Sequence, residues 1–181
     1  MTTTDSVRIR RADRRDAPAL GRLGAALVRA HHGFDSRRFL TPGPRLEEGY
    51  ARFLRTQLAE KDVAIFVAER AGTIIGYVYA GVEPRSWKEL RDVAGFIHDV
   101  VVDPGARRSG IGTRLVETAA AWLAARGIPR VMLCTAEKNP EAQRLFEHLG
   151  FRRTMIEMTR DRPTGAVDAR TEGRVTVETD P

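Results

Sequence analysis

The chain has 181 residues, of which 42% are hydrophobic and 30% charged, a composition typical of one globular domain with a hydrophobic core. No apolar run approaches the ~20 residues of a membrane-spanning helix, and the first residues form no apolar signal segment, so we expect a cytoplasmic protein without a membrane partner. The net charge of +6 would suit nucleic acid, but the arginines are scattered and aromatic residues make up only 7%. We therefore expect a polyanionic small molecule as partner, and no nucleic acid.

Hydrophobic periodicity and turn residues predict, in chain order, a strand at 7–10, a helix from Asp13 or Asp16 through Val28, a loop from His31, a helix at 47–58, strands at 63–68 and 73–82 in a hairpin, a strand at 96–102, a helix at 111–125, a strand at 130–134, a helix at 139–150 and a last strand at 151–159. This order predicts a single-domain α/β fold, with one mixed central sheet and helices on both faces. We place the domain at 1–160 and a polar C-terminal tail at 161–181. The lone cysteine excludes an internal disulfide, and no residues have the spacing of a metal site, so we expect no metal.

The stretch at 100–117, VVVDPGARRSGIGTRLVE, changes from an apolar strand through a glycine-rich loop to an amphipathic helix. Glycines let backbone N–H groups approach an anion closely, and the start of a helix adds the positive end of its dipole. The dinucleotide fingerprint fails because its third glycine is absent, and the P-loop fails because Ile111 and Gly112 stand where Lys and Ser/Thr belong. The remaining pattern suits a pyrophosphate held mainly by backbone. A glycine-rich turn on a basic surface stays open as the alternative.

This loop, behind its apolar strand, resembles motif A of the GNAT superfamily of N-acyltransferases, and NPEAQRLFEHLGF from Asn139 resembles motif B. The resemblance covers most of 63–160 and implies the GNAT fold, acetyl-CoA as co-substrate, and an amine of a small molecule or peptide as acceptor. Homodimers are common in that family, so the resemblance allows one here. It implies cofactor contacts from the backbone of Val100, Val101 and Val102 along the pantetheine, and from Arg107, Arg108, Ser109, Gly110, Ile111, Gly112 and Thr113 around the pyrophosphate.

The strand FIHDVVV carries two ionisable residues, His98 and Asp99, in apolar surroundings. Burying such groups is costly unless they are paired or useful. An amine must lose a proton before it attacks a thioester, and a histidine with a pKa near ~6.5 suits that task. Strand alternation predicts that His98 shares a face with Val100 and Val102, and that Asp99 faces the other side.

GNAT enzymes often place a Glu or His on this strand as the base, so the resemblance also favours His98. We predict His98 as the catalytic base and Asp99 as the second candidate. A core histidine bonded to backbone, and an Asp99 paired with an arginine, remain the structural alternatives.

Asn139 followed by Pro140 is typical of a helix N-cap, and the resemblance implies that this Asn also contacts the cofactor. Phe146 stands where many GNAT members have a tyrosine that protonates the leaving thiolate, so the resemblance places Phe146 beside the cofactor without an acid. The prediction is an acetyl-CoA-dependent N-acetyltransferase. A catalytically inactive acyl-CoA-binding or sensing domain is the first alternative. An NAD- or ATP-binding protein is the second, and the failed fingerprints count against it.

Overall fold

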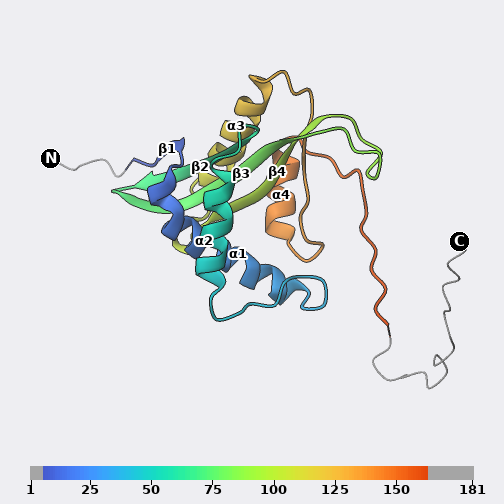
Figure 1. Ribbon diagram of the computed structural model, residues 1–181, viewed down its shortest axis with the longest axis horizontal. Coiled ribbons are helices and arrows are strands. Elements are labelled where there is room, and N and C mark those ends of the chain that lie inside the picture. Colours follow the sequence, from blue (N-terminus) through green and yellow to red (C-terminus); the bar gives the residue numbers. More distant parts are fainter. Residues whose placement is uncertain (1–5, 163–181) are drawn as a thin grey trace, which may run out of the picture.

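The structure, a computed structural model, describes residues 6–162, which form a five-stranded sheet with strand order β1-β2-β3-β4-β5 (Figure 1). Its elements are β1 Arg8–Arg11, η1 Arg14–Asp16, α1 Ala17–Phe34, α2 Leu46–Gln57, β2 Val63–Arg70, β3 Thr73–Glu83, β4 Ala94–Val102, η2 Pro104–Ala106, α3 Ile111–Ala124, β5 Val131–Leu133 and α4 Pro140–His148. Strands β1 to β4 are antiparallel neighbours, and β5 runs parallel to β4. This arrangement confirms the predicted mixed sheet.

Each face of the sheet is covered by its own pair of helices. On one face, α1 and α2 contribute Leu20, Leu23 and Leu54 to a cluster that includes Ile65 and Val67 of β2. Figure 1 shows α1 and α2 side by side over that face. On the other face, α3 and α4 contribute residues such as Ile111, Leu115 and Phe146, which pack with Val78 and Ala80 of β3. Successive strand side chains point to opposite faces, so one apolar strand serves both layers.

Strands β4 and β5 pair over only three residues of each strand. Gly95, Phe96 and Ile97 lie opposite 131–133, and the pairing ends there. The backbone on that side of β4 therefore has no partner strand from His98 onward among the described residues.

Two predicted elements differ from the structure. The loop predicted from His31 begins later, because α1 continues to Phe34, and His31 stabilises this last turn by ring contacts with Phe34 and Phe39 and a hydrogen bond between its Nδ1 and the Leu27 carbonyl. The predicted last strand at 151–159 is wrong, because none of these residues is assigned to a strand.

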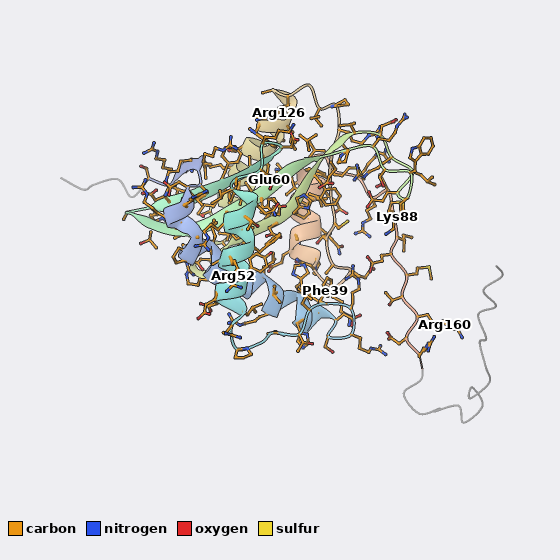
Figure 2. All side chains as sticks on the ribbon, in the orientation of Figure 1. Phe39, Arg52, Glu60, Lys88, Arg126 and Arg160 are labelled. Carbon is orange, nitrogen blue, oxygen red and sulfur yellow. The ribbon has the colours of Figure 1, made fainter. Side chains whose placement is uncertain are left out.

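The segment after α4 has the sequence pattern of a strand but lacks a partner strand among the described residues. It runs away from the sheet, as Figure 1 shows, and Figure 2 marks Arg160 at its far end. Met155, Ile156 and Met158 are all more than 80% exposed, and Arg38 ties the segment to the loop after α1 through Glu157. A strand needs a neighbour to satisfy its backbone, and alternation alone does not provide one. Residues 163–181 of the predicted tail lie outside the described residues. Among the described residues, no helix is long and apolar enough to cross a membrane.

Candidate active site

A cavity of about 220 Å³ opens where β4 and β5 part. Its walls come from the last turns of α1, the loop on which Figure 2 marks Phe39, the middle of β4, the end of β5 and one side of α4. The cavity reaches both layers of the fold, because Leu27 packs with the α1/α2 layer and Phe146 with the α3/α4 layer. Five of the predicted site residues line it: His98, Asp99, Val100, Asn139 and Phe146.

A β-bulge in β4 corrects the predicted orientation of its two ionisable residues. Tyr79 of β3 lies opposite Asp99, but Ala80 lies opposite Ile97, so His98 is the extra residue of β4. A bulge of this kind shifts the alternation by one residue and turns side chains to a new face. His98 stacks on Tyr79, which belongs to the α1/α2 layer and faces Asp99 across the strands. Both His98 and Asp99 therefore project toward α1 and α2, and the prediction of opposite faces is wrong.

The His98 imidazole lies between aromatic rings and one carboxylate. Its ring centroid is 4.6 Å from that of Tyr79 and 4.9 Å from that of Phe96. Its Nε2 is 3.2 Å from Oε1 of Glu83, and its side chain is 28% exposed. Partial burial lowers the pKa of His98 below its usual value, although the negative charges of Glu83 and Asp99 act in the opposite direction. A lower pKa keeps the ring neutral at neutral pH, the form that can accept a proton.

Asp99 is buried, and two tyrosines hold it. Tyr50 of α2 and Tyr77 of β3 donate hydrogen bonds of 2.7 Å and 2.8 Å to Oδ2 of Asp99. Burial raises the pKa of Asp99 despite these two hydrogen bonds. Burial and the charge of Asp99 also raise the pKa of each tyrosine, so both hydroxyls stay protonated and act as donors. The structural alternative, in which Asp99 pairs with an arginine, is wrong for the described residues, because Tyr50 and Tyr77 are its partners.

The glycine loop ends β4 and begins α3 in a conformation that frees backbone donors. Gly110 has a φ of +78°, a left-handed conformation that favours glycine, and it caps α3. The first backbone bond of the helix runs from the Arg114 N–H to the Gly110 carbonyl, at 3.1 Å. The N–H groups of Ile111, Gly112 and Thr113 therefore precede the helical ladder and are the donors that an anion can use.

The side chains of this loop mostly stabilise the loop itself. Arg107 donates from Nε to the Val102 carbonyl at 3.2 Å, and Ser109 donates to the Ala106 carbonyl at 2.6 Å. Arg108 has a φ of +59°, a left-handed conformation uncommon for a residue with a side chain. The side chain of Ile111 is buried in the core, so only its backbone can serve a ligand.

Gly112 also has a packing role, besides the backbone donor that its motif suggests. A Cβ at this position would lie 3.3 Å from Cδ2 of Leu145, so the glycine allows α4 to approach α3 closely. It also brings the loop beside α4, which forms one wall of the cavity. The loop does not line the cavity itself, but Gly112 lies beside α4 and the end of β4, the helix and the strand that supply two of the cavity walls.

Helix α4 supplies the last two predicted residues. Oδ1 of Asn139 accepts a hydrogen bond of 3.2 Å from the Ala142 N–H, which confirms the predicted N-cap. Phe146 is buried against Phe151, with ring centroids 5.9 Å apart. No tyrosine is among the described residues that line the cavity, and these residues include no group of three His, Cys, Asp or Glu side chains that could hold a metal.

Three residues of the site were missed by sequence reasoning: Tyr50, Tyr77 and Glu83. The strand TIIGYVYAGVE carries its tyrosines on alternate positions, a pattern that fits an ordinary core strand. Their meaning depends on the register between β3 and β4, which places Asp99 beside them. That register, with its bulge, brings Tyr77 and Glu83 to Asp99 and His98, and the packing of α2 on the sheet adds Tyr50.

Several known acetyltransferases are similar to this chain in sequence or in fold. A mycothiol acetyltransferase of Thermomonospora curvata is 36% identical over 113 residues, which is 61% of this chain and 36% of that protein. An aminoglycoside N-acetyltransferase in complex with CoA has a TM-score of 0.72 at 18% identity, covering 90% of this chain and 99% of the other. A GCN5-related N-acetyltransferase from Ralstonia eutropha has a TM-score of 0.66 at 26% identity, covering 86% and 98%.

The chain spans about a third of the length of the mycothiol acetyltransferases that it matches. The family model described as "Acetyltransferase (GNAT) family" matches residues 30–151, which include most of the residues that line the cavity, β4, the glycine loop and the capped helix α4. The chain therefore belongs to the GNAT family of acetyltransferases.

Proposed function

We propose that this chain is an N-acetyltransferase that moves an acetyl group from acetyl-CoA to a primary amine of a small molecule or peptide. The observation that carries the proposal is that β4 and α4, which supply His98 and Phe146 to the cavity walls, also lie beside the free N–H donors at the start of α3. An anion is bound by such donors at a helix start, and a thioester placed in the cavity would lie beside a neutral histidine.

In this proposal the N–H groups at 111–113 bind the pyrophosphate of CoA, supported by the loop residues Arg107 to Gly110. The open edge of β4 at Val100, Val101 and Val102 pairs with the pantetheine amides. Asn139 and Phe146, at the cavity wall, lie beside the pantetheine and the thioester. The open edge of β4 and the cavity support this arrangement, and the choice of CoA as the ligand rests on membership of the family.

The reaction follows from these positions. The amine nitrogen attacks the thioester carbonyl carbon, the new C–N bond replaces the C–S bond, and CoA leaves as a thiolate. His98 takes the proton that the amine must lose, directly or through water. The thiolate takes its proton from water, because no tyrosine lines the cavity among the described residues. A thiol with a pKa near ~8.5 is a good enough leaving group for this.

Isothermal titration with acetyl-CoA, NAD and ATP tests the cofactor, and we expect binding of acetyl-CoA alone. Release of free CoA is then measured with aminoglycosides, polyamines, amino acids, peptides and the acceptor of mycothiol acetyltransferases. We expect turnover with at least one amine, and light scattering tests for a homodimer. Tight binding of acetyl-CoA without turnover in the whole screen would favour the second candidate, an inactive acyl-CoA-binding domain. Phe146, in place of an acid, is the observation on its side.

A further inference from the structure

Glu83, at the end of β3, has a carboxylate that contacts His98. Glu83 is the last residue of β3, and its Oε1 lies 3.2 Å from Nε2 of His98. Tyr79, Gly81 and Glu83 are alternate residues of β3 and share one face of the sheet. Because Gly81 has no side chain, the imidazole can lie over the strand between Tyr79 and Glu83. A Cβ on Gly81 would stand 3.6 Å from Nε2 of His98.

Glu83 is itself held in place at the base of the β3–β4 hairpin. Arg91 lies 3.8 Å from Oε2 of Glu83 and donates to the Pro84 carbonyl at 2.8 Å. Its backbone exchanges two hydrogen bonds with Ser86, and its side chain is only 12% exposed. Arg91 also bonds Glu89 at 2.6 Å, so the same guanidinium contacts two carboxylates, of which only Glu83 contacts His98.

We propose that Glu83 is a positioning residue that holds His98 as a base with its proton on Nε2 and its lone pair on Nδ1. This inference rests on the proposed function. A carboxylate can only accept a hydrogen bond, so the neutral ring that contacts Glu83 carries its proton on Nε2. Nδ1 is then the nitrogen that takes the proton from the attacking amine. The imidazolium formed in that step keeps its bond to Glu83, whose negative charge stabilises it.

The charges around His98 set the expected direction of any change. Glu83 and Asp99 both raise the pKa of His98, against the larger effect of burial. Tyr79 has its pKa raised to about 12 and stays neutral through an ordinary assay range. Arg91 acts through Glu83, and His31 of α1, which lines the same cavity, interacts with Asp99. Loss of the Glu83 charge should therefore lower the pKa of His98.

The test measures His98 itself as well as activity. In the full chain without ligand, ¹H–¹⁵N spectra of the four histidines give the tautomer and titration midpoint of each, and His98→Gln identifies the His98 signals. We expect His98 to carry its proton on Nε2 in the wild type. In Glu83→Gln we expect its midpoint to fall by about 0.3 pH unit or more. The rising limb of kcat/KM against pH should fall with it, and Glu83→Asp should restore part of the shift.

Glu89→Gln is the matched control, because it removes a carboxylate from the same arginine without contacting His98. It should leave both midpoints unchanged. A wild-type His98 with its proton on Nδ1, or a midpoint that stays in place in Glu83→Gln, would overturn the inference whatever the chain catalyses. If the His98 midpoint moves and the kcat/KM limb does not, Glu83 holds His98 but His98 is not the base. Glu83 would then have no positioning role in catalysis. Binding of acetyl-CoA is tested separately by titration.

Discussion

Asp16 and Asp99 are the two buried charged residues of the described core, and their surroundings differ in one respect. Asp16 accepts bonds of 2.7 Å and 2.8 Å from the two terminal nitrogens of Arg10, which hold the pKa of its carboxyl below the usual value. Asp99 accepts bonds from two tyrosine hydroxyls, and burial raises its pKa. One carboxylate is neutralised by a cation, and the other is held by neutral donors.

The difference separates a carboxylate held in a structural ion pair from a carboxylate in the wall of the candidate active site. Asp16 joins β1 to the start of α1, since Arg10 lies on β1 and Asp16 ends the turn before the helix. Asp99 lies in the wall of the cavity beside His98, where a charge without a contacting cation costs stability. Ionisable groups with shifted pKa values in a cavity are typical of active sites. Stability should therefore depend on the first region and activity on the second.

The largest expected effect is on activity at the cavity. His98→Ala removes the proposed base, so kcat/KM should fall by ~10²–10⁴-fold. The unfolding midpoint should change little, because the side chain is partly exposed and no core cluster depends on it. Steady-state rates and thermal unfolding of the same preparations check both halves. Retention of more than a third of wild-type kcat/KM would remove His98 from the mechanism.

The next effect is on stability at the structural pair. Asp16→Asn leaves Arg10 without its main partner, and we expect the free energy of unfolding at pH 7 to fall by about 1–3 kcal/mol, less than for a fully buried pair because Arg10 is 25% exposed. Chemical denaturation measures this change. The folded pKa of Asp16 lies below its unfolded value, so its contribution is complete above about pH 4 and is lost as pH falls further.

The gap between wild type and Asp16→Asn should therefore close in acid. Glu47→Gln, which breaks the exposed pair of Glu47 with Arg29, is the control and should cost under about 0.5 kcal/mol. Rates per folded molecule should be unchanged in both variants. If the rate per folded molecule also fell in Asp16→Asn, Asp16 would affect activity as well as stability, and the proposed division between the two regions would be wrong.

A third test asks whether the functional region includes the glycine loop. Gly110→Ala forces a side chain into a left-handed conformation at the start of α3, which costs ~1–2 kcal/mol and should disturb the free N–H groups. We expect affinity for acetyl-CoA to fall about tenfold in calorimetric titration. Gly105→Ala is the control, because its Cβ meets open space and its φ is not left-handed. Equal affinity in the two variants would place the pyrophosphate elsewhere.

The smallest effect concerns the missing acid. Phe146→Tyr adds one hydroxyl at the cavity wall, and the thiolate already leaves readily without help. We expect kcat to change by less than about tenfold, which is below the ~10²–10⁴-fold typical of general acid catalysis. An inactive wild type combined with an active Phe146→Tyr variant would instead identify the chain as a CoA-binding domain that lacks its acid.

Sequence reasoning was sufficient where a local pattern decides the structure. The N-cap at Asn139, the start of α3 at Gly110 and the mixed sheet all depend on short-range signals, and all are found. It failed where a distant partner decides. The alternation of 151–159 predicts a strand, but no neighbour is present among the described residues.

The same limit applies to the site. His98 and Asp99 are visible in the sequence as polar residues in an apolar strand, but the bulge that turns both to one face depends on pairing with β3. Tyr50 comes from a helix 49 residues away from Asp99. This contact follows from the packing of α2 on the sheet, and the local sequence around Tyr50 or Asp99 does not predict it.

The central claim is that His98 is the base of an acetyl transfer, and the pH dependence of kcat/KM tests it most directly. The profile is measured with one amine for the wild type, His98→Ala and Asp99→Asn, so that ionisation of the amine contributes equally to all three. The account predicts a rising limb in the wild type with the midpoint of the His98 imidazole measured by NMR, its loss in His98→Ala, and its survival in Asp99→Asn. A limb that persists in His98→Ala and disappears in Asp99→Asn would contradict the account and make Asp99 the base.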